Sequence, residues 1–140
     1  MKKNHIFKVF LFLLAIFDLS AFQNDSENKI KIKSEKVEVN NDFENVNFIN
    51  NVFINSQYVK ISANSAIYNN NNKTISITGD PSSIESIKDE NIYVGAAKKI
   101  IFFNDEKVHL IGNASMKLEN ISISSDLIIF NTRTGKIASK

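Results

Sequence analysis

Side chains that could perform chemistry are few and widely separated in this sequence. His5 lies in an N-terminal stretch that we expect to be removed, which leaves His109 as the candidate imidazole. Carboxylates occur as the neighbouring pairs Asp89-Glu90 and Asp105-Glu106, and paired carboxylates act as acid and base when they are buried together. Both pairs fall in predicted turns, where carboxylates are solvated, and His109 is expected on the exterior of a strand. We therefore predict that the protein is not an enzyme.

Composition argues against several other classes of function. The chain has no cysteine, and we find neither a histidine cluster nor a glycine-rich loop, so we expect no metal and no cofactor. Loss of residues 1–21 would remove three of the 17 basic residues and one of the 15 acidic residues, leaving 14 of each. A balanced charge gives no basic footprint for nucleic acid, and we expect no nucleic-acid partner.

Residues 1–21 are typical of a secretory signal peptide. Lys2, Lys3 and Lys8 are basic, residues 9–17 are uninterruptedly apolar, and small residues precede a predicted cleavage after Ala21. The apolar run is shorter than the roughly 20 residues that a membrane span needs. An uncleaved membrane anchor is the alternative. We expect a flexible leader at residues 22–28 and one domain at residues 29–140.

A short sequence motif recurs four times in that domain. It begins with a small residue, continues with a polar pair and ends in an apolar-x-apolar step, and its copies start 29, 34 and 28 residues apart. Such spacing is typical of stacked repeats. The copies are Ser34–Asn40, Ala63–Asn69, Ala97–Phe103 and Ser125–Asn131.

Apolar residues alternate with polar ones along the whole domain, which predicts an all-β chain of short strands with an apolar interior and a polar exterior. Polar or glycine corners follow inward strands at Phe48–Val52, Ile77–Asp80 and Leu110–Ala114. We expect the strand before Gly79 to end at Pro81, because proline cannot donate to a ladder, and residues 82–90 to form a short strand and a loop. A sandwich, a barrel or a solenoid would satisfy this pattern.

The C-terminal motifs resemble the OstA-like, or LptA, family. They are the corner Ile111-Gly-Asn-Ala114 with its apolar strand, the run Ile123–Asn131 that ends in an aromatic residue, and the Thr134-Gly135 hairpin. Ala63–Tyr68 and Gly95–Ile100 are similar to earlier turns of the same pattern. The resemblance covers residues 29–140. The chain ends soon after Thr134-Gly135, so we expect a reduced last strand.

The resemblance implies a twisted, open β-jellyroll in the periplasm. It implies that the interior binds the lipid A acyl chains of lipopolysaccharide and that related domains stack edge to edge, head to tail. The implied partners are lipopolysaccharide, an inner-membrane LptC-like protein and an outer-membrane LptD-like protein. The expected role is transport of lipopolysaccharide from the inner to the outer membrane without chemistry.

The candidate residues are the apolar residues that we expect to face the interior of the sheet. Aromatic candidates for a core or a lipid groove are Phe43, Phe48, Phe53, Tyr68, Phe102 and Phe130. The predicted lipid groove is lined by Val39, Phe48, Ile61, Tyr68, Ile77, Ile100, Phe102, Leu110, Met116, Ile128 and Phe130. The predicted edge-docking residues are Ile30, Ile32, Ile121, Ile123 and Ile137.

Two other functions stay open at this point. One is a membrane-anchored structural or interaction partner with the same fold, similar to LptC, which an uncleaved N-terminus would favour. The other is a sugar-active enzyme on a β-solenoid, which would need a carboxylate cluster that we do not find in the sequence.

Overall fold

The protein consists of antiparallel β-strands throughout the residues that the computed structural model describes, which are 7–9, 17–18 and 29–140. The predicted signal peptide and leader otherwise lie outside the described residues. The strands are β1 (Phe7–Val9), β2 (Phe17–Asp18), β3 (Lys31–Lys33), β4 (Lys36–Val39), β5 (Asn45–Asn55), β6 (Val59–Asn69), β7 (Thr74–Lys88), β8 (Asn91–Phe103), β9 (Lys107–Leu118), β10 (Ile121–Asn131) and β11 (Ile137–Ser139).

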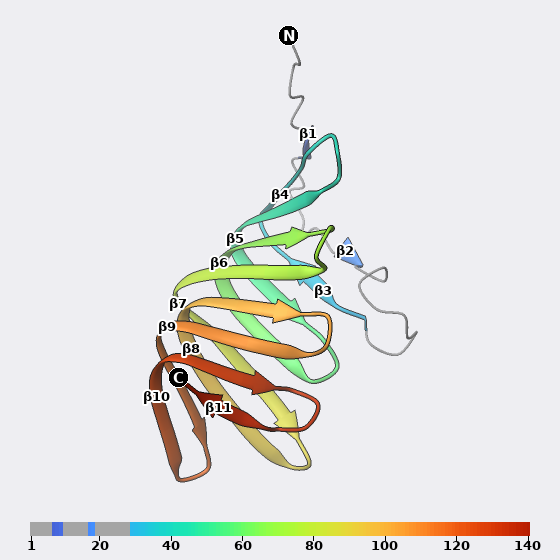
Figure 1. The fold of residues 1–140 in the computed structure, drawn as a ribbon. Coiled ribbons are helices and arrows are strands. Elements are labelled where there is room, and N and C mark those ends of the chain that lie inside the picture. Colours follow the sequence, from blue (N-terminus) through green and yellow to red (C-terminus); the bar gives the residue numbers. More distant parts are fainter. Residues whose placement is uncertain (1–6, 10–16, 19–28) are drawn as a thin grey trace.

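All of these strands belong to a single sheet (Figure 1). From β4 to β11 each strand pairs with the next one in the sequence. β3 and β4 lie along different halves of β5, with Ile32 opposite Ile54 and Val37 opposite Phe48. On their other sides, β1 pairs with β4 and β2 pairs with β3.

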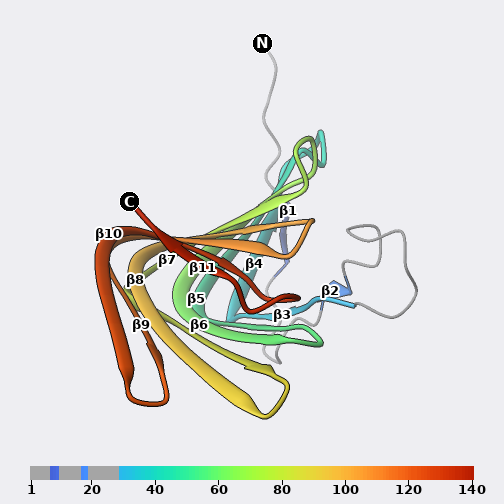
Figure 2. The ribbon, with the colours of Figure 1, turned by 60° about the horizontal axis from the view of Figure 1, so that its bottom comes forward.

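The long strands bend in the middle, so that the sheet folds over itself into two arms (Figure 2). Each arm carries a row of inward residues that lie opposite one another from strand to strand. The row of the first arm is Ile32, Ile54, Ile61, Ile84, Gly95, Met116 and Ile123. A row of the second arm is Val37, Phe48, Ala66, Ile77, Ile100, Leu110 and Ile128. These rows face each other and form the core, which confirms the open β-jellyroll expected from the sequence.

Two kinds of corner produce the bends. In β5 and β9 a pair of consecutive residues has positive φ, Asn50-Asn51 (63° and 48°) and Gly112-Asn113 (81° and 45°). Glycine and asparagine tolerate this left-handed conformation best. In β6, β7, β8 and β10 the inward phase changes instead, from odd-numbered to even-numbered residues, where the register of the strand pairs shifts. Such bulges bend a sheet without ending it.

Pro81 is the clearest departure from the sequence-based expectation. It does not end a strand, because β7 continues from Thr74 to Lys88 and the predicted loop at residues 82–90 is instead strand up to Lys88. The register of β7 and β8 shifts between Thr78 and Ser82, so the missing N–H of Pro81 falls where the ladder is already interrupted. The strands are therefore long and bent, and not short as the alternation suggested.

The repeated sequence motif corresponds to one part of the structure. Its first copy contains β4, and the other three copies are the halves of β6, β8 and β10 that follow their bends. All four lie in the second arm, where their apolar steps supply inward residues, such as Ile100 and Phe102 in β8. The structural repeat is thus a hairpin of two bent strands.

Gly95 is a position in the first-arm row at which a side chain of the second arm approaches the backbone closely. A Cβ atom at this position would lie 2.8 Å from Leu110 Cδ2, which belongs to the second arm. It would also lie 3.0 Å from Ile84 Cγ2 and 3.1 Å from the carbonyl oxygen of Ser115. The absence of a side chain at Gly95 therefore lets Leu110 fill the space between the arms.

We expect Gly95→Val to lower the free energy of unfolding by about 1–3 kcal/mol, because overpacking a filled core forces its neighbours to move. Chemical denaturation measures the effect. Ala96→Val is the matched control, because Ala96 is the adjacent residue of β8 and is only partly buried. If both variants unfold like the wild type, the arms do not pack against each other at Gly95.

Candidate lipid-binding interior and sheet edges

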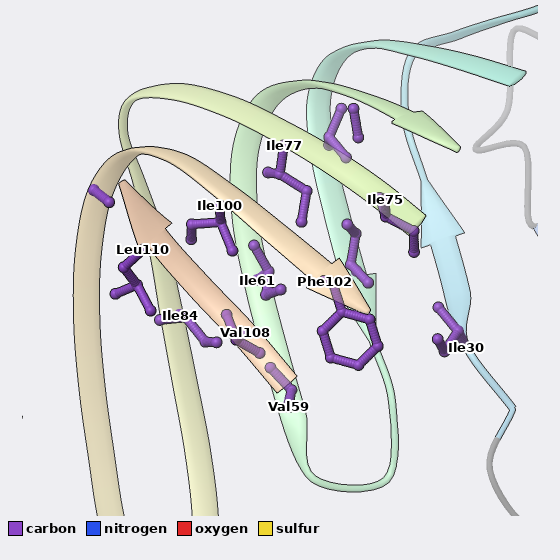
Figure 3. Packing of buried hydrophobic residues seen from close by; sticks show 14 of the residues in the cluster. Ile30, Val59, Ile61, Ile75, Ile77, Ile84, Ile100, Phe102, Val108 and Leu110 are labelled. Atoms are coloured by element: carbon purple, nitrogen blue, oxygen red, sulfur yellow. The ribbon is translucent and has the colours of Figure 1, made fainter. Parts of the chain in front are cut away.

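The predicted groove residues all take inward positions of the folded sheet. Ten of the eleven are buried, and Val39 is partly buried at the margin of the core. The buried ones are Phe48, Ile61, Tyr68, Ile77, Ile100, Phe102, Leu110, Met116, Ile128 and Phe130. Figure 3 shows how side chains of both arms, including Ile61, Ile77 and Leu110, point into the space between the arms. Their position is established, and their contact with lipid stays a prediction.

Two of the six aromatic candidates do not belong to the interior. Phe43 is 69% exposed and has a positive φ of 53° in the turn between β4 and β5. Phe53 is 37% exposed, because it has the outward phase between the inward residues Val52 and Ile54. β5 keeps its inward phase across the bend at Asn50-Asn51, so the alternation of Val52 and Ile54 already gives Phe53 the outward phase.

A second row in the second arm runs closer to the hairpin tips. It consists of Val39, Val46, Tyr68, Ile75, Phe102, Val108, Phe130 and Ile137. Phe130 contacts the opposite arm through Tyr93, with ring centroids 5.0 Å apart. The side chain of Tyr93 also lies against Gly135, where a Cβ atom would be 2.6 Å from the Tyr93 hydroxyl. The arms are thus closed on each other in this structure, and an acyl chain could enter between them only if they separate.

The interior is covered at one end of the sheet and exposed at the other. Ile30 and Ile32, predicted for edge docking, are fully buried. At the opposite end β11 pairs only with residues 128–130 of β10, so residues 121–125 have no strand on that side among the described residues. Ile121 is 62% exposed there, and Ile123 and Ile137 are partly buried against the core. The β10 edge therefore presents apolar side chains of the inner face.

The exterior is less polar than the sequence suggested. On the outer face of the second arm, Ile101 lies opposite His109, which lies opposite Ile129. The His109 ring packs on Phe103, with centroids 4.6 Å apart. Burial lowers the pKa of His109, and the charges of Lys107 and Lys140 lower it further, against the opposing effect of Asp105. His109 is outward as predicted, but it packs against a neighbouring ring.

The neighbouring residues Asp105 and Glu106 lie in different environments in the structure. Burial raises the pKa of Asp105, but the Lys107 N–H, at 3.1 Å, and the Lys107 ammonium group, at 3.1 Å, hold it below its usual value. Glu106 was expected in solvent and is in fact buried. Its carboxylate pairs with Arg133 at 3.4 Å, and its carbonyl oxygen accepts hydrogen bonds from Thr132. This residue joins the β8–β9 turn to the β10–β11 turn.

Other sites are not apparent in the described part of the chain. It contains no group of three or more His, Cys, Asp or Glu side chains that could hold a metal ion. It also contains no helix long and apolar enough to span a membrane. A hollow of about 560 Å³ at the bends of β9 and β10 is lined by Asn113, Ala114, Ser115, Ser124, Ser125, Asp126 and Lys140, a largely polar set that does not suit an acyl chain.

The fold and the interior define the class of protein: an open β-jellyroll with an apolar interior and an unpaired edge. The sequence model of one family, described as LptA/(LptD N-terminal domain) LPS transport protein, matches residues 26–136. The chain belongs to this family, which supports a role in lipopolysaccharide transport. No curated protein matched the sequence.

A solved structure supports the fold independently. It is the crystal structure of LptH, the LptA homologous periplasmic component of the lipopolysaccharide transport device of Pseudomonas aeruginosa. The two structures agree with a TM-score of 0.73 over 84% of this chain and 85% of LptH, at 17% sequence identity. This likeness shows that the jellyroll is shared.

We expect Phe130→Asp to cost at least about 3 kcal/mol of folding free energy, because it replaces a fully buried ring with a charge that has no partner. Thermal and chemical unfolding measure the loss. Ile129→Asp, one residue away on the outer face, is expected to cost much less. Equal losses in the two variants would contradict the assignment of the inner face.

Proposed function

We propose that the protein carries lipopolysaccharide across the periplasm from the inner to the outer membrane, without chemistry, by holding acyl chains between the two arms. The observation that carries the proposal is the continuous set of inward apolar rows that reaches an exposed edge at Ile121. Membership of the transport family and the likeness to a periplasmic component support it. Each buried CH₂ group of a lipid chain would contribute about 0.8 kcal/mol to binding.

Separation of the arms is the step that this function requires. The contacts between them at Tyr93–Phe130 and Leu110–Gly95 are apolar, and an acyl chain can replace apolar contacts without leaving polar groups unpaired. The bends at Asn50-Asn51 and Gly112-Asn113 provide places where the strands can flex without breaking the ladders of either arm.

We further propose that copies of the domain assemble head to tail. An unpaired strand edge is a template for a strand of another chain. Cleavage after Ala21 would remove β1 and β2 and leave β3 and β4 as an open edge, which differs in sequence from the β10 edge. Two different edges make a heterologous contact, and such contacts generate open chains. An LptC-like protein at the inner membrane and an LptD-like protein at the outer membrane would terminate them.

The alternative is a membrane-anchored partner of the same fold, similar to LptC. Retention of residues 1–21 would favour it, and mass spectrometry of the N-terminus of the protein made in cells distinguishes the two. A product that begins at Phe22 supports the soluble carrier, whereas an intact N-terminus in membranes supports the anchored partner.

Photo-crosslinking tests where the lipid binds. A photoreactive residue at Phe102 is expected to capture lipopolysaccharide, because this side chain is buried between the arms. The control is the same residue at Ile101, which is adjacent in β8 and faces outward. Equal capture at both positions would indicate adsorption to the surface and would contradict the proposed interior site.

Light scattering at rising concentration tests assembly. We expect Ile121→Asp to weaken chain growth, because it places a charge where the inner face would continue into the next copy. Ile92→Asp is the matched control, since Ile92 is 52% exposed but has the outward phase of β8. A wild-type protein that stays monomeric, or two variants that assemble equally well, would count against docking at this edge.

A further inference from the structure

β7 places two serine hydroxyl groups in the apolar interior of the first arm. Ser82 and Ser86 alternate with Ile84 on the inward phase, and their exposed fractions are 0% and 1%. Within the described part of the chain, neither Oγ atom has a hydrogen-bond partner. A buried hydroxyl group without a partner lowers stability, and natural structures contain few such groups.

The other buried serine and the buried threonine of the described residues form hydrogen bonds. Ser34 Oγ donates to the carbonyl oxygen of Lys36 at 2.9 Å, and Thr132 Oγ1 donates to that of Glu106 at 3.1 Å. Both belong to turns, where the side chain replaces a missing backbone contact. Ser82 and Ser86 lie in a strand whose backbone groups pair with β6 and β8, so a turn role does not explain them.

The position of Ser86 connects it to the exposed edge. It belongs to an inward row of the first arm that runs Val59, Ser86, Tyr93, Leu118 and Ile121. Exposure rises along this row, from buried Val59 to partly buried Leu118 and 62% exposed Ile121. A chain that enters between the arms at Ile121 and follows the row would therefore reach Ser86.

Ser82 lies deeper, beside the bend. A Cβ atom at Gly79 would be 2.7 Å from Ser82 Oγ, so this hydroxyl fills the space beside the glycine backbone. Ser82 and Ser86 are four residues apart, which places them about 13 Å from each other along a strand. The interior of the first arm thus has a hydroxyl group at each of two depths.

We propose that Ser82 and Ser86 donate hydrogen bonds to oxygen atoms carried along an acyl chain, such as a hydroxyl or an ester carbonyl. The interior would then prefer oxygen-bearing chains over plain hydrocarbon chains. A charged headgroup could not be the acceptor at this depth without a large desolvation cost. This inference rests on the proposed function, because it assumes that acyl chains enter between the arms.

Competitive binding of oleate and ricinoleate to the purified full chain tests the proposal, because the two acids differ by one hydroxyl group in the middle of the chain. We expect the wild type to bind ricinoleate about fivefold more tightly, the effect of one additional hydrogen bond. The double variant Ser82→Ala/Ser86→Ala should lose this preference, still bind oleate, and melt at a higher temperature than the wild type. A rise in melting temperature is expected because the unpaired hydroxyl groups have been removed.

Ser34→Ala is the control, because it removes a satisfied buried hydroxyl group. It should lower the melting temperature and keep the preference for ricinoleate. An unchanged preference in the double variant, or equal binding of both acids by the wild type, would overturn the role of the serines and leave the transport function standing. Failure to bind either acid would overturn the proposed acyl-chain site itself, and this inference with it.

Discussion

The structure depends on one constraint: a strand that crosses from one arm to the other must keep its apolar side chains on the inner face. Side chains alternate with a period of two, so the geometry of the bend decides whether the residues beyond it that face the core have odd or even numbers. β5 and β9 conserve it with two consecutive left-handed residues, whereas β6, β7, β8 and β10 change phase at a bulge. In both solutions the strands pair again beyond the bend, so a single sheet can enclose its own core. The inward rows of both arms follow from this constraint.

A core enclosed in this way has properties that an ordinary sandwich lacks. The arms are joined along the bends, and across the interior they are held by apolar contacts such as Tyr93 against Phe130. If the arms separate around an acyl chain, each inward side chain exchanges an apolar contact with the opposite arm for an apolar contact with the lipid. The hydrogen bonds between strands within each arm stay intact. Among the described residues, the inner face also ends at residues 121–125 of β10, which have no strand on their second side, so that the interior is continuous with the outside there without a separate entrance. A packed protein that is open at one edge is therefore suited to a long apolar ligand.

Much of this arrangement could be predicted from the sequence, because period-two alternation reports directly which side chains share a face. The inward placement of Phe102 and Phe130 follows from it, and the corner at Gly112-Asn113 follows from its glycine and asparagine residues. Alternation does not report how a strand passes a bend, which is why Pro81 was expected to end β7. Phe53 is a different case, because its alternation with Val52 and Ile54 already gave it the outward phase. Glu106 illustrates a different limit, since its partner Arg133 approaches only when two hairpin turns stack in the folded sheet. The unpaired hydroxyl groups of Ser82 and Ser86 gave no sequence signal, because serine is ordinary on an exposed strand face.

The central claim is that the two arms separate to receive an acyl chain. Electron spin resonance between two labels measures this separation directly, and the chain has no native cysteine that would compete for labelling. Cysteines in place of Glu90, at the β7–β8 hairpin, and Asn104, at the β8–β9 turn, would put exposed labels at the ends of the first and second arm. The account predicts that the distance between the labels increases when lipopolysaccharide binds and returns when it is removed. An unchanged distance at saturating lipopolysaccharide, with binding confirmed on the same sample, would contradict it.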